Sequence, residues 1–277
     1  MNILVLEMKI LKYLNLKDQE LMVQFKRLYF DIEVSPNIGF FWQSGYKLQI
    51  PHNNIIKERA IICVCYKWEH EKEVHSLEWK KGDDKQLLIK FLKVLNEADE
   101  VVGQNSDNFD IKWLRTRCLY HKIEMMPTYS SVDTYKLAKQ YFRFNSNKLD
   151  YMSSFLGYGN KIHTEYDLWR KIVLDNDAKS MQLMVKYCKK DVLLTEKVHQ
   201  TMKNYTKHKT HVGVAMGETK IDCPECGSDH IQSRGYAITA VGTKFKRCQC
   251  QNCGKWYRIN LNVYNKAISI KNNKAIV

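Results

Sequence analysis

A short apolar run that ends in two acidic residues, R-L-Y-F-D-I-E-V over residues 27–34, constrains the fold of this 277-residue chain more than any other segment. The run is rich in residues that favour β-strands, and Ser-Pro-Asn at 35–37 terminates it. Because side chains two positions apart on a strand point the same way, Asp31 and Glu33 are expected on one face. The sequence therefore predicts a strand that presents two carboxylates to a neighbouring element.

The remainder of the first 205 residues shows further strand patterns followed by helical ones. Apolar runs at 60–68 and 73–79 are predicted to pair with the first strand as a meander, and 100–104 is predicted as a further strand. The leucine stripe within 83–98 predicts an amphipathic helix with an aspartate cap. Further helical patterns cover residues 108–122, 134–142, 148–156 and 177–203. This order favours a mixed α/β domain with a central mixed sheet flanked by helices.

Composition limits the compartment and the class of partner. With 44 Lys plus Arg against 30 Asp plus Glu, the net charge of +14 favours polyanions, nucleic acid before anionic membrane. The charge is densest in residues 206–277, which carry 12 basic and 4 acidic side chains. Nine cysteines without a secretory signal indicate a reducing compartment, so we expect a cytoplasmic protein. No apolar stretch approaches the roughly 18 residues of a membrane span, and no membrane partner is expected.

Two later segments also carry acidic residues in or next to predicted elements. G-Q-N-S-D-N-F-D at 103–110 follows a predicted strand, and Y-C-K-K-D at 187–191 lies in a predicted helix, on which Tyr187 and Asp191 share a face. Carboxylate oxygens are the ligands that Mg²⁺ and Mn²⁺ prefer, and phosphoryl transfer needs such charge beside the scissile phosphate. Carboxylates that converge without cations raise one another's pKa, so bound divalent ions are expected if these residues meet.

These motifs resemble those of the DEDD superfamily of 3′-to-5′ exonucleases, which includes polymerase proofreading domains and has a ribonuclease-H-like fold. The resemblance covers about residues 26–204 and rests on F-D-I-E at 30–33, N-S-D-N-F-D at 105–110 and Y-C-K-K-D at 187–191. A tyrosine four positions before the last aspartate is typical of the DEDDy subgroup. The second motif departs in detail, because Gln104 stands where relatives often carry histidine.

The resemblance implies the chemistry of a two-metal exonuclease. The four residues expected to hold two Mg²⁺ or Mn²⁺ ions are Asp31, Glu33, Asp110 and Asp191. Tyr187 would orient the attacking water, and nucleoside 5′-monophosphates would leave one at a time from a 3′ end. Asp107 is a less favoured alternative to Asp110 as a ligand. Single-stranded DNA is the favoured substrate, ahead of RNA.

Several residues near these motifs are weaker candidates for substrate contact. Asn105 belongs to the second motif, and the aromatic faces of Phe41 and Trp42 could stack on a terminal base or could equally belong to the core. Phosphate contacts are plausible, although a solvated helix cap is the more conservative interpretation, for Arg143, Asn145, Asn147 and Lys148.

Two C-x-x-C pairs mark a second module near the C-terminus. The pairs are Cys223 with Cys226 and Cys250 with Cys253, and this spacing predicts one structural Zn²⁺ held by four thiolates in a zinc ribbon. Cys248 could replace Cys250, and His230 could also substitute. A redox dithiol is the competing interpretation. Thiols outside the ribbon sit in apolar contexts and are expected to be buried: Cys63, Cys65, Cys118 and Cys188.

The ribbon also carries a mixture of charge and aromatic rings that is typical of a nucleic-acid surface. Its members are Lys244, Phe245, Lys246, Arg247, Lys255, Trp256, Tyr257 and Arg258. A solvated basic face with aromatic residues that pack the small domain is the alternative. We expect this module to supply binding rather than chemistry.

The expected organisation has five segments. They are a helical N-terminal extension at 1–25, the exonuclease domain at 26–205, a linker at 206–218, the zinc ribbon at 219–262 and a basic tail at 263–277. No polymerase domain fits in this length, so proofreading would need a separate polymerase or replication protein as partner. The compact, lysine- and asparagine-rich composition is typical of a phage or low-GC bacterial replication protein.

Two alternatives to the exonuclease stay open at this point. One is a non-catalytic zinc-ribbon protein that binds nucleic acid, with the ribonuclease-H-like domain as a scaffold. The other is a structure-specific endonuclease on the same fold. Separation of Asp31, Glu33, Asp110 and Asp191 in space, or a basic residue that plugs them, would argue against the enzyme.

Overall fold

The computed structural model describes residues 24–45, 47–162 and 164–274, and the predicted N-terminal helix at 1–25 lies almost wholly outside them. The chain divides into two compact units, and the boundary between them falls between Thr206 and Lys207. In the described part of the chain, no helix combines the length and the apolar character needed to cross a membrane.

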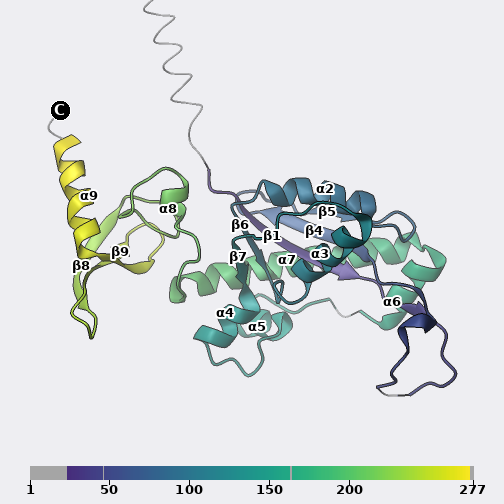
Figure 1. Ribbon diagram of the computed structural model, residues 1–277. Coiled ribbons are helices and arrows are strands. Elements are labelled where there is room, and N and C mark those ends of the chain that lie inside the picture. Colours follow the sequence, from purple (N-terminus) through teal and green to yellow (C-terminus); the bar gives the residue numbers. More distant parts are fainter. Residues whose placement is uncertain (1–23, 46, 163, 275–277) are drawn as a thin grey trace, which may run out of the picture. The chain divides into compact units, whose positions relative to one another are not determined.

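A five-stranded mixed sheet forms the centre of the first unit (Figure 1). Its strand order is β5 (His75–Glu78), β4 (Ile61–Trp68), β1 (Arg27–Val34), β6 (Glu100–Gly103) and β7 (Ser131–Asp133). The predicted meander is present, because β4 pairs antiparallel with both β1 and β5. On the other side of β1, strands β6 and β7 run parallel to it. Strands β2 (Ile38–Gly39) and β3 (Ile55–Lys57) form a separate small hairpin.

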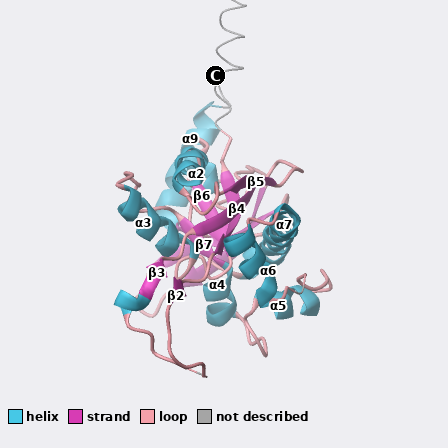
Figure 2. Cartoon of the chain, turned by 90° about the vertical axis from the view of Figure 1, so that its right-hand side faces the viewer, coloured by secondary structure: helices cyan, strands magenta, loops and turns pink. Residues whose placement is uncertain are grey.

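Helices cover both faces of this sheet, as Figure 2 shows. One face packs on α2 (Lys85–Asn96) and α3 (Asp110–His121), and the other packs on α7 (Ala178–Met202). The remaining helical elements of the unit are α4 (Thr134–Tyr141), α5 (Leu149–Phe155), α6 (Tyr166–Arg170), a π-helical turn at Lys171–Asp175, and two short 3₁₀ turns at His52–Asn54 and Lys203–Tyr205. The expected class, a mixed central sheet flanked by helices, is confirmed.

Strict alternation along β1 decides which residues reach which layer. Leu28, Phe30 and Ile32 pack in the core under α2 and α3. Tyr29 enters the opposite core, under α7. Asp31 and Glu33, two and four positions later on the strand, point to the same face as Tyr29. The two carboxylates therefore point toward α7, the helix that carries the third acidic motif.

The start of α2 uses the two expected aspartates differently. Asp83 Oδ1 accepts a hydrogen bond of 3.0 Å from the N–H of Lys85, the first residue of the helix. Asp84, at the N-cap position, makes no side-chain capping hydrogen bond. Its buried carboxylate instead accepts hydrogen bonds from the Ile61 N–H at 2.9 Å and from the Arg117 guanidinium at 2.7 and 2.9 Å. Asp84 therefore ties β4 to α3 rather than starting α2.

The second unit contains a three-stranded antiparallel sheet in the order β10 (Trp256–Asn260), β9 (Lys244–Cys250) and β8 (Ile231–Ile238). Helix α9 (Leu261–Lys274) follows β10 and occupies much of the range expected to be a basic tail. The expected linker at 206–218 contains the short helix α8 (Val212–Ala215), and the Val212 N–H donates to the Pro224 carbonyl at 2.9 Å. This segment is therefore bonded to the loop that carries the first cysteine pair.

Candidate active site

Acidic residues from β1 and α7 meet at the face of the sheet that α7 covers. Asp31, Glu33 and Asp191 each offer a carboxylate oxygen, and these three atoms lie within 4.8 Å of one another. Asp191 is 2% exposed, whereas the two strand residues are half-buried. Residues 160 positions apart in the sequence thus form one carboxylate cluster, because the strand face and the helix face are opposed.

Asp110 joins this cluster from the start of α3. It is buried, and its Oδ1 accepts a hydrogen bond of 3.1 Å from the Ile32 N–H, between the two acidic residues of β1. Asp107 lies apart from this arrangement, since its carboxylate accepts from the Ser131 hydroxyl at 2.6 Å and pairs with Lys136 at 2.8 Å. Of the two candidates in the second motif, the structure brings Asp110 to the cluster.

The cluster has electrostatics that favour bound cations. Burial raises the pKa of Asp31 well above its ordinary value, and the charges of Asp110, Asp191 and Glu33 raise it further. Burial and then Asp191 raise the pKa of Glu33 to about 8, and burial raises that of Asp110 to about 7. Shifts in this direction mean that the ionised carboxylates lack enough positive charge around them.

Lys161 provides part of that charge, and nothing in the sequence pattern predicted it. The loop after α5 carries this lysine, whose main-chain N–H donates to Asp150 Oδ1 at 2.8 Å. Its Nζ lies 2.5 Å from Asp191 Oδ2 and 5.1 Å from the centre of the Tyr187 ring. Although burial lowers the pKa of Lys161, the adjacent Asp191 carboxylate more than offsets this and raises the pKa above its ordinary value.

A basic residue that plugs the carboxylates would argue against an enzyme. Lys161 is such a basic residue, but it occupies only part of the cluster. One ammonium cannot balance four ionised carboxylates, and the pKa values of Asp31, Glu33 and Asp110 stay raised in its presence. Lys161 also holds only one oxygen of Asp191. The other, Oδ1, is buried without a hydrogen-bond partner.

This donor set fits divalent metal ions. Oxygen ligands from carboxylates suit Mg²⁺ and Mn²⁺, and a buried carboxylate oxygen without a partner costs free energy unless a cation or donor meets it. The residues that would hold the ions are Asp31, Glu33, Asp110 and Asp191.

Tyr187 borders the cluster from α7. Burial and the neighbouring Asp191 raise the pKa of its hydroxyl above the ordinary value, so the group stays protonated at neutral pH. The hydroxyl interacts with Asp191 and with Lys161. Tyr187 and Asp191 therefore share the face of α7 that the four-residue spacing predicted.

Phe41 and Trp42 are not core residues. They lie between β2 and the turn at His52–Asn54, where Trp42 is 101% exposed, Phe41 57% and the preceding Phe40 75%. The hairpin begins five residues after Glu33, and Figure 1 shows its dark purple loop projecting away from the central sheet. These three rings form an aromatic loop that is open to solvent.

The polar candidates are divided between structural and exposed positions. Asn105 adopts a left-handed φ of 57°, its N–H donates to Asp133 Oδ1 at 2.9 Å, and its side chain accepts from Asn108 at 3.2 Å. The Asn147 carbonyl accepts from Gln104 at 2.9 Å. Arg143 and Lys148 are exposed. The asparagines therefore shape loops, while the two basic side chains face solvent.

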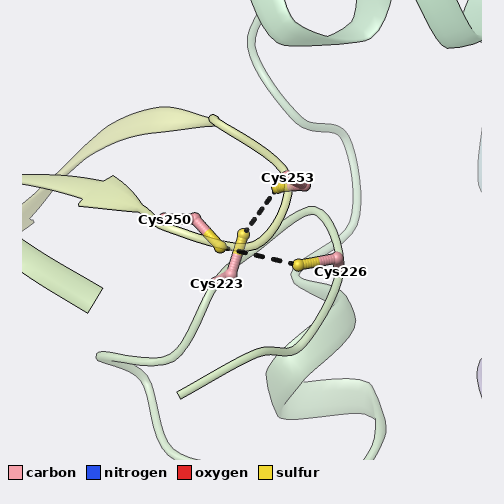
Figure 3. A group of neighbouring side chains, drawn as sticks. All are labelled: Cys223, Cys226, Cys250 and Cys253. Atoms are coloured by element: carbon pink, nitrogen blue, oxygen red, sulfur yellow. Dashed lines mark hydrogen bonds between the residues drawn. The ribbon is translucent and has the colours of Figure 1, made fainter. Parts of the chain in front are cut away.

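The four ribbon cysteines converge in the second unit (Figure 3). The Sγ atoms of Cys223 and Cys253 are 3.6 Å apart, and those of Cys226 and Cys250 are 3.7 Å apart. These separations are too long for disulfides, and four Zn–S bonds of about 2.3 Å in a tetrahedron place sulfur atoms roughly 3.8 Å apart. The donor set and its spacing fit a structural zinc ion.

The alternative ligands of the ribbon lie elsewhere. Cys248 is buried in the small hydrophobic core with Ile221 and Ile259, and His230 is exposed outside the group of thiols. Cys250, rather than Cys248, completes the second pair.

The expected nucleic-acid surface of the ribbon needs one correction. Lys255 is 1% exposed, and its Nζ lies 3.4 Å from Glu225 Oε2, so it is a buried structural residue. Tyr257 also has a structural contact, because its hydroxyl donates to the Ile221 carbonyl at 2.8 Å. The remaining members stay at or near the surface. There, Lys246 stacks on Tyr236 at 4.1 Å and Arg258 on Phe245 at 4.8 Å.

The fold and the carboxylate cluster are those expected of the ribonuclease-H-like class, and a family model identifies the family. Residues 49–215 match the family described as "Predicted 3'-5' exonuclease related to the exonuclease domain of PolB". The match covers more than half of the chain, so the protein belongs to this family. It includes Asp110, Tyr187 and Asp191, and it begins after Asp31 and Glu33 and ends before the ribbon cysteines.

A solved structure has the same fold. The family B DNA polymerase from the hyperthermophilic archaeon Pyrobaculum calidifontis aligns with a TM-score of 0.52 and 18% sequence identity over 69% of this chain. The alignment spans 26% of the polymerase. A search of curated proteins finds no match.

Proposed function

We propose that the protein is a two-metal-ion 3′-to-5′ exonuclease that removes nucleoside 5′-monophosphates from single-stranded nucleic acid, with DNA as the preferred substrate. The observation that carries this proposal is the convergence of Asp31, Glu33 and Asp191 within 4.8 Å, with Asp110 bonded to the same strand. Membership of a family of predicted 3′-5′ exonucleases supports the direction of cleavage.

Two divalent ions bound here would stabilise the attacking and leaving oxygens of the scissile phosphate. Asp31 and Glu33 offer oxygens from the strand, and Asp110 and Asp191 offer oxygens from two helices, so the ligands come from three fixed elements. Rigid placement of this kind is what metal-assisted phosphoryl transfer requires.

Two further side chains would act on the substrate and the water. The protonated Tyr187 hydroxyl, held beside Asp191, can orient the attacking water by a hydrogen bond. Lys161 neutralises Asp191 in the absence of metal, and once Asp191 binds a cation, the lysine ammonium can contact a phosphate oxygen instead. Both groups lie at the cluster, and neither forms a covalent bond to the substrate.

The second unit would hold the nucleic acid rather than cleave it. We propose that the four ribbon cysteines bind one structural Zn²⁺, without which this small sheet lacks enough core to fold. Its exposed Trp256 and the stacked Lys246 and Arg258 provide rings and charge of the kind that bind single strands. A separate polymerase or replication protein would be the source of 3′ ends.

The deciding experiment incubates the protein with 3′-labelled and 5′-labelled single strands of DNA and RNA, with and without Mg²⁺. We expect mononucleotide release from the 3′ end only with Mg²⁺, and a loss of at least about 10³-fold in Asp31→Asn and Asp191→Asn. Asp107→Asn, a carboxylate outside the cluster, is the matched control and should retain activity.

The outcomes separate the alternative functions. Wild-type activity in either cluster variant would sink the two-metal proposal. Binding without hydrolysis by the wild type would favour the non-catalytic zinc-ribbon protein. Cleavage of a circular single strand would favour an endonuclease, because an exonuclease has no end at which to start.

A further inference from the structure

Three buried thiols adjoin the carboxylate cluster. Cys63, Cys65 and Cys188 are each 0% exposed, and their Sγ atoms all lie within 4.8 Å of one another. Two come from β4 and the third from α7, more than 120 positions later in the chain. Cys118 is buried on the opposite face of the sheet, and within the described part of the chain it belongs to no such group.

Strand register ties this cluster to the carboxylates. Asp31 is the cross-strand partner of Cys65, and Glu33 is the partner of Cys63. Cys188 lies between Tyr187 and Asp191 on α7, and its Sγ donates to the Asp31 carbonyl at 3.4 Å and lies 3.5 Å from Asp31 Oδ2. A change in the state of these thiols therefore acts on a proposed metal ligand through one atomic contact.

We propose that Cys63, Cys65 and Cys188 form a further metal site, which binds a thiophilic divalent cation such as Zn²⁺ or Cd²⁺ and thereby inhibits the exonuclease. The inhibitory part rests on the proposed function, whereas the binding part does not. Soft thiolate ligands favour Zn²⁺ and Cd²⁺ over the Mg²⁺ and Mn²⁺ that suit the neighbouring oxygens. The two sites are therefore selective for different ions although they adjoin.

The geometry requires little rearrangement. Three Zn–S bonds of about 2.3 Å place the sulfur atoms roughly 3.8 to 4.0 Å apart, so the sulfurs need to approach by less than about 1 Å. On binding, three S–H bonds break, three metal–sulfur bonds form and three protons pass to solvent. Cys188 can then no longer donate its proton to Asp31, and the bound cation competes for Asp31 Oδ2.

The test titrates Cd²⁺ into full-length protein whose ribbon is already loaded with zinc, and follows the ultraviolet absorption of cadmium–thiolate bonds. Cys63→Ser and Cys65→Ser are the site variants, and Cys118→Ser is the matched control for loss of a buried thiol. Exchange at the ribbon contributes equally to every protein. We expect wild type and Cys118→Ser to bind one more Cd²⁺ per chain through sulfur than either site variant does.

Activity with excess Mg²⁺ gives the second readout. Cd²⁺ should inhibit wild type and Cys118→Ser at similar concentrations. Half-inhibition of Cys63→Ser should need at least about a tenfold higher Cd²⁺ concentration. Equal cadmium–sulfur absorption in all four proteins would overturn the site. Extra uptake with equal inhibition would overturn the regulatory part alone.

If the wild type had no exonuclease activity, the proposed function would be wrong. The number of Cd²⁺ ions bound through sulfur would still test the thiol site. Should Cys63→Ser fail to fold, Cys65→Ser and the apolar Cys65→Ala decide the same question.

Discussion

The two carboxylate oxygens of Asp191 have different surroundings. One of its oxygens pairs with Lys161 at 2.5 Å, and the other is buried without a partner. A carboxylate in this position stabilises the protein only when positive charge reaches it, from the lysine or from a metal ion. Under the proposed function, Lys161 and the metal ions would compete for the Asp191 carboxylate.

Replacement of Lys161 by methionine, which is one heavy atom shorter and removes the charge, tests this competition. We expect Mg²⁺ to bind roughly tenfold more tightly, because it no longer displaces an ammonium from Asp191. Isothermal titration of Mg²⁺ without substrate measures the effect. Lys171→Met, which removes an exposed lysine paired with Asp167, is the control. Weaker Mg²⁺ binding in Lys161→Met would refute the competition.

The raised carboxylate pKa values predict how stability depends on pH without added Mg²⁺ or Mn²⁺. Glu33 and Asp110 have pKa values of about 8 and about 7, above their ordinary values. Between about pH 4.5 and pH 8 the folded state binds more protons than the unfolded state, so the free energy of unfolding falls as pH rises through this window.

Asp110→Asn isolates the contribution of one buried carboxyl to this slope. The variant removes a group that must ionise in the interior, so its Tm at pH 8 should exceed that of wild type by at least about 2 °C, with a smaller difference at pH 5. Thermal unfolding of zinc-loaded protein without Mg²⁺ measures both. An equal difference at the two pH values would show that ionisation is not the cause.

At the scale of elements, β1 and α7 account for most of what the sequence could predict. Alternation along β1 and the four-residue spacing on α7 each fix one face locally, and the two faces are opposed once the helix covers the sheet. Most of the central strands and the main helices therefore followed from periodicity, whereas the convergence of Asp31, Glu33 and Asp191 was expected only through the resemblance of the motifs to a known family.

Other features depend on contacts that periodicity does not encode. Lys161 lies in a loop without a repeating pattern, and its role arises only from tertiary contact with Asp191. Strand β7 has three residues, too few for alternation to be visible. Asp84 has the side chain of a typical helix cap, but its carboxylate accepts two hydrogen bonds from the buried Arg117 instead. The charge of Lys255 led to the prediction that it lies on the surface, but its side chain is buried and pairs with Glu225.

The aromatic loop between β2 and β3 is the element whose role is least explained by folding, because its rings are exposed. We expect the double variant Phe41→Ala/Trp42→Ala to raise KM for single-stranded DNA roughly tenfold, since stacking of a base on an aromatic ring contributes about 1–3 kcal/mol. The kcat should change little. Leu119→Ala, which removes an equally exposed apolar side chain from α3, is the control. An unchanged KM would exclude stacking on this loop.

At the scale of the whole molecule, chemistry and charge are divided between the two units. The four carboxylates and Tyr187 all lie in residues 26–206, whereas residues 207–277 hold the four ribbon cysteines and 12 basic against 4 acidic side chains. Lysine and arginine that neutralise phosphates bind nucleic acid in a salt-dependent way. Affinity for long strands should therefore depend on the second unit, and turnover on short strands should not.

Removal of residues 207–277 tests this division at the boundary between the compact units. We expect the Kd for a long single strand to rise at least about tenfold, with a shallower dependence on salt, because fewer phosphates are neutralised. The kcat on a short oligonucleotide should stay within about twofold of the full-length value. Cys223→Ser/Cys226→Ser in the full chain keeps every charge but removes two ribbon ligands, so it separates the folded ribbon surface from charge alone. Loss of hydrolysis on the short oligonucleotide after truncation would show that the ribbon takes part in the chemistry.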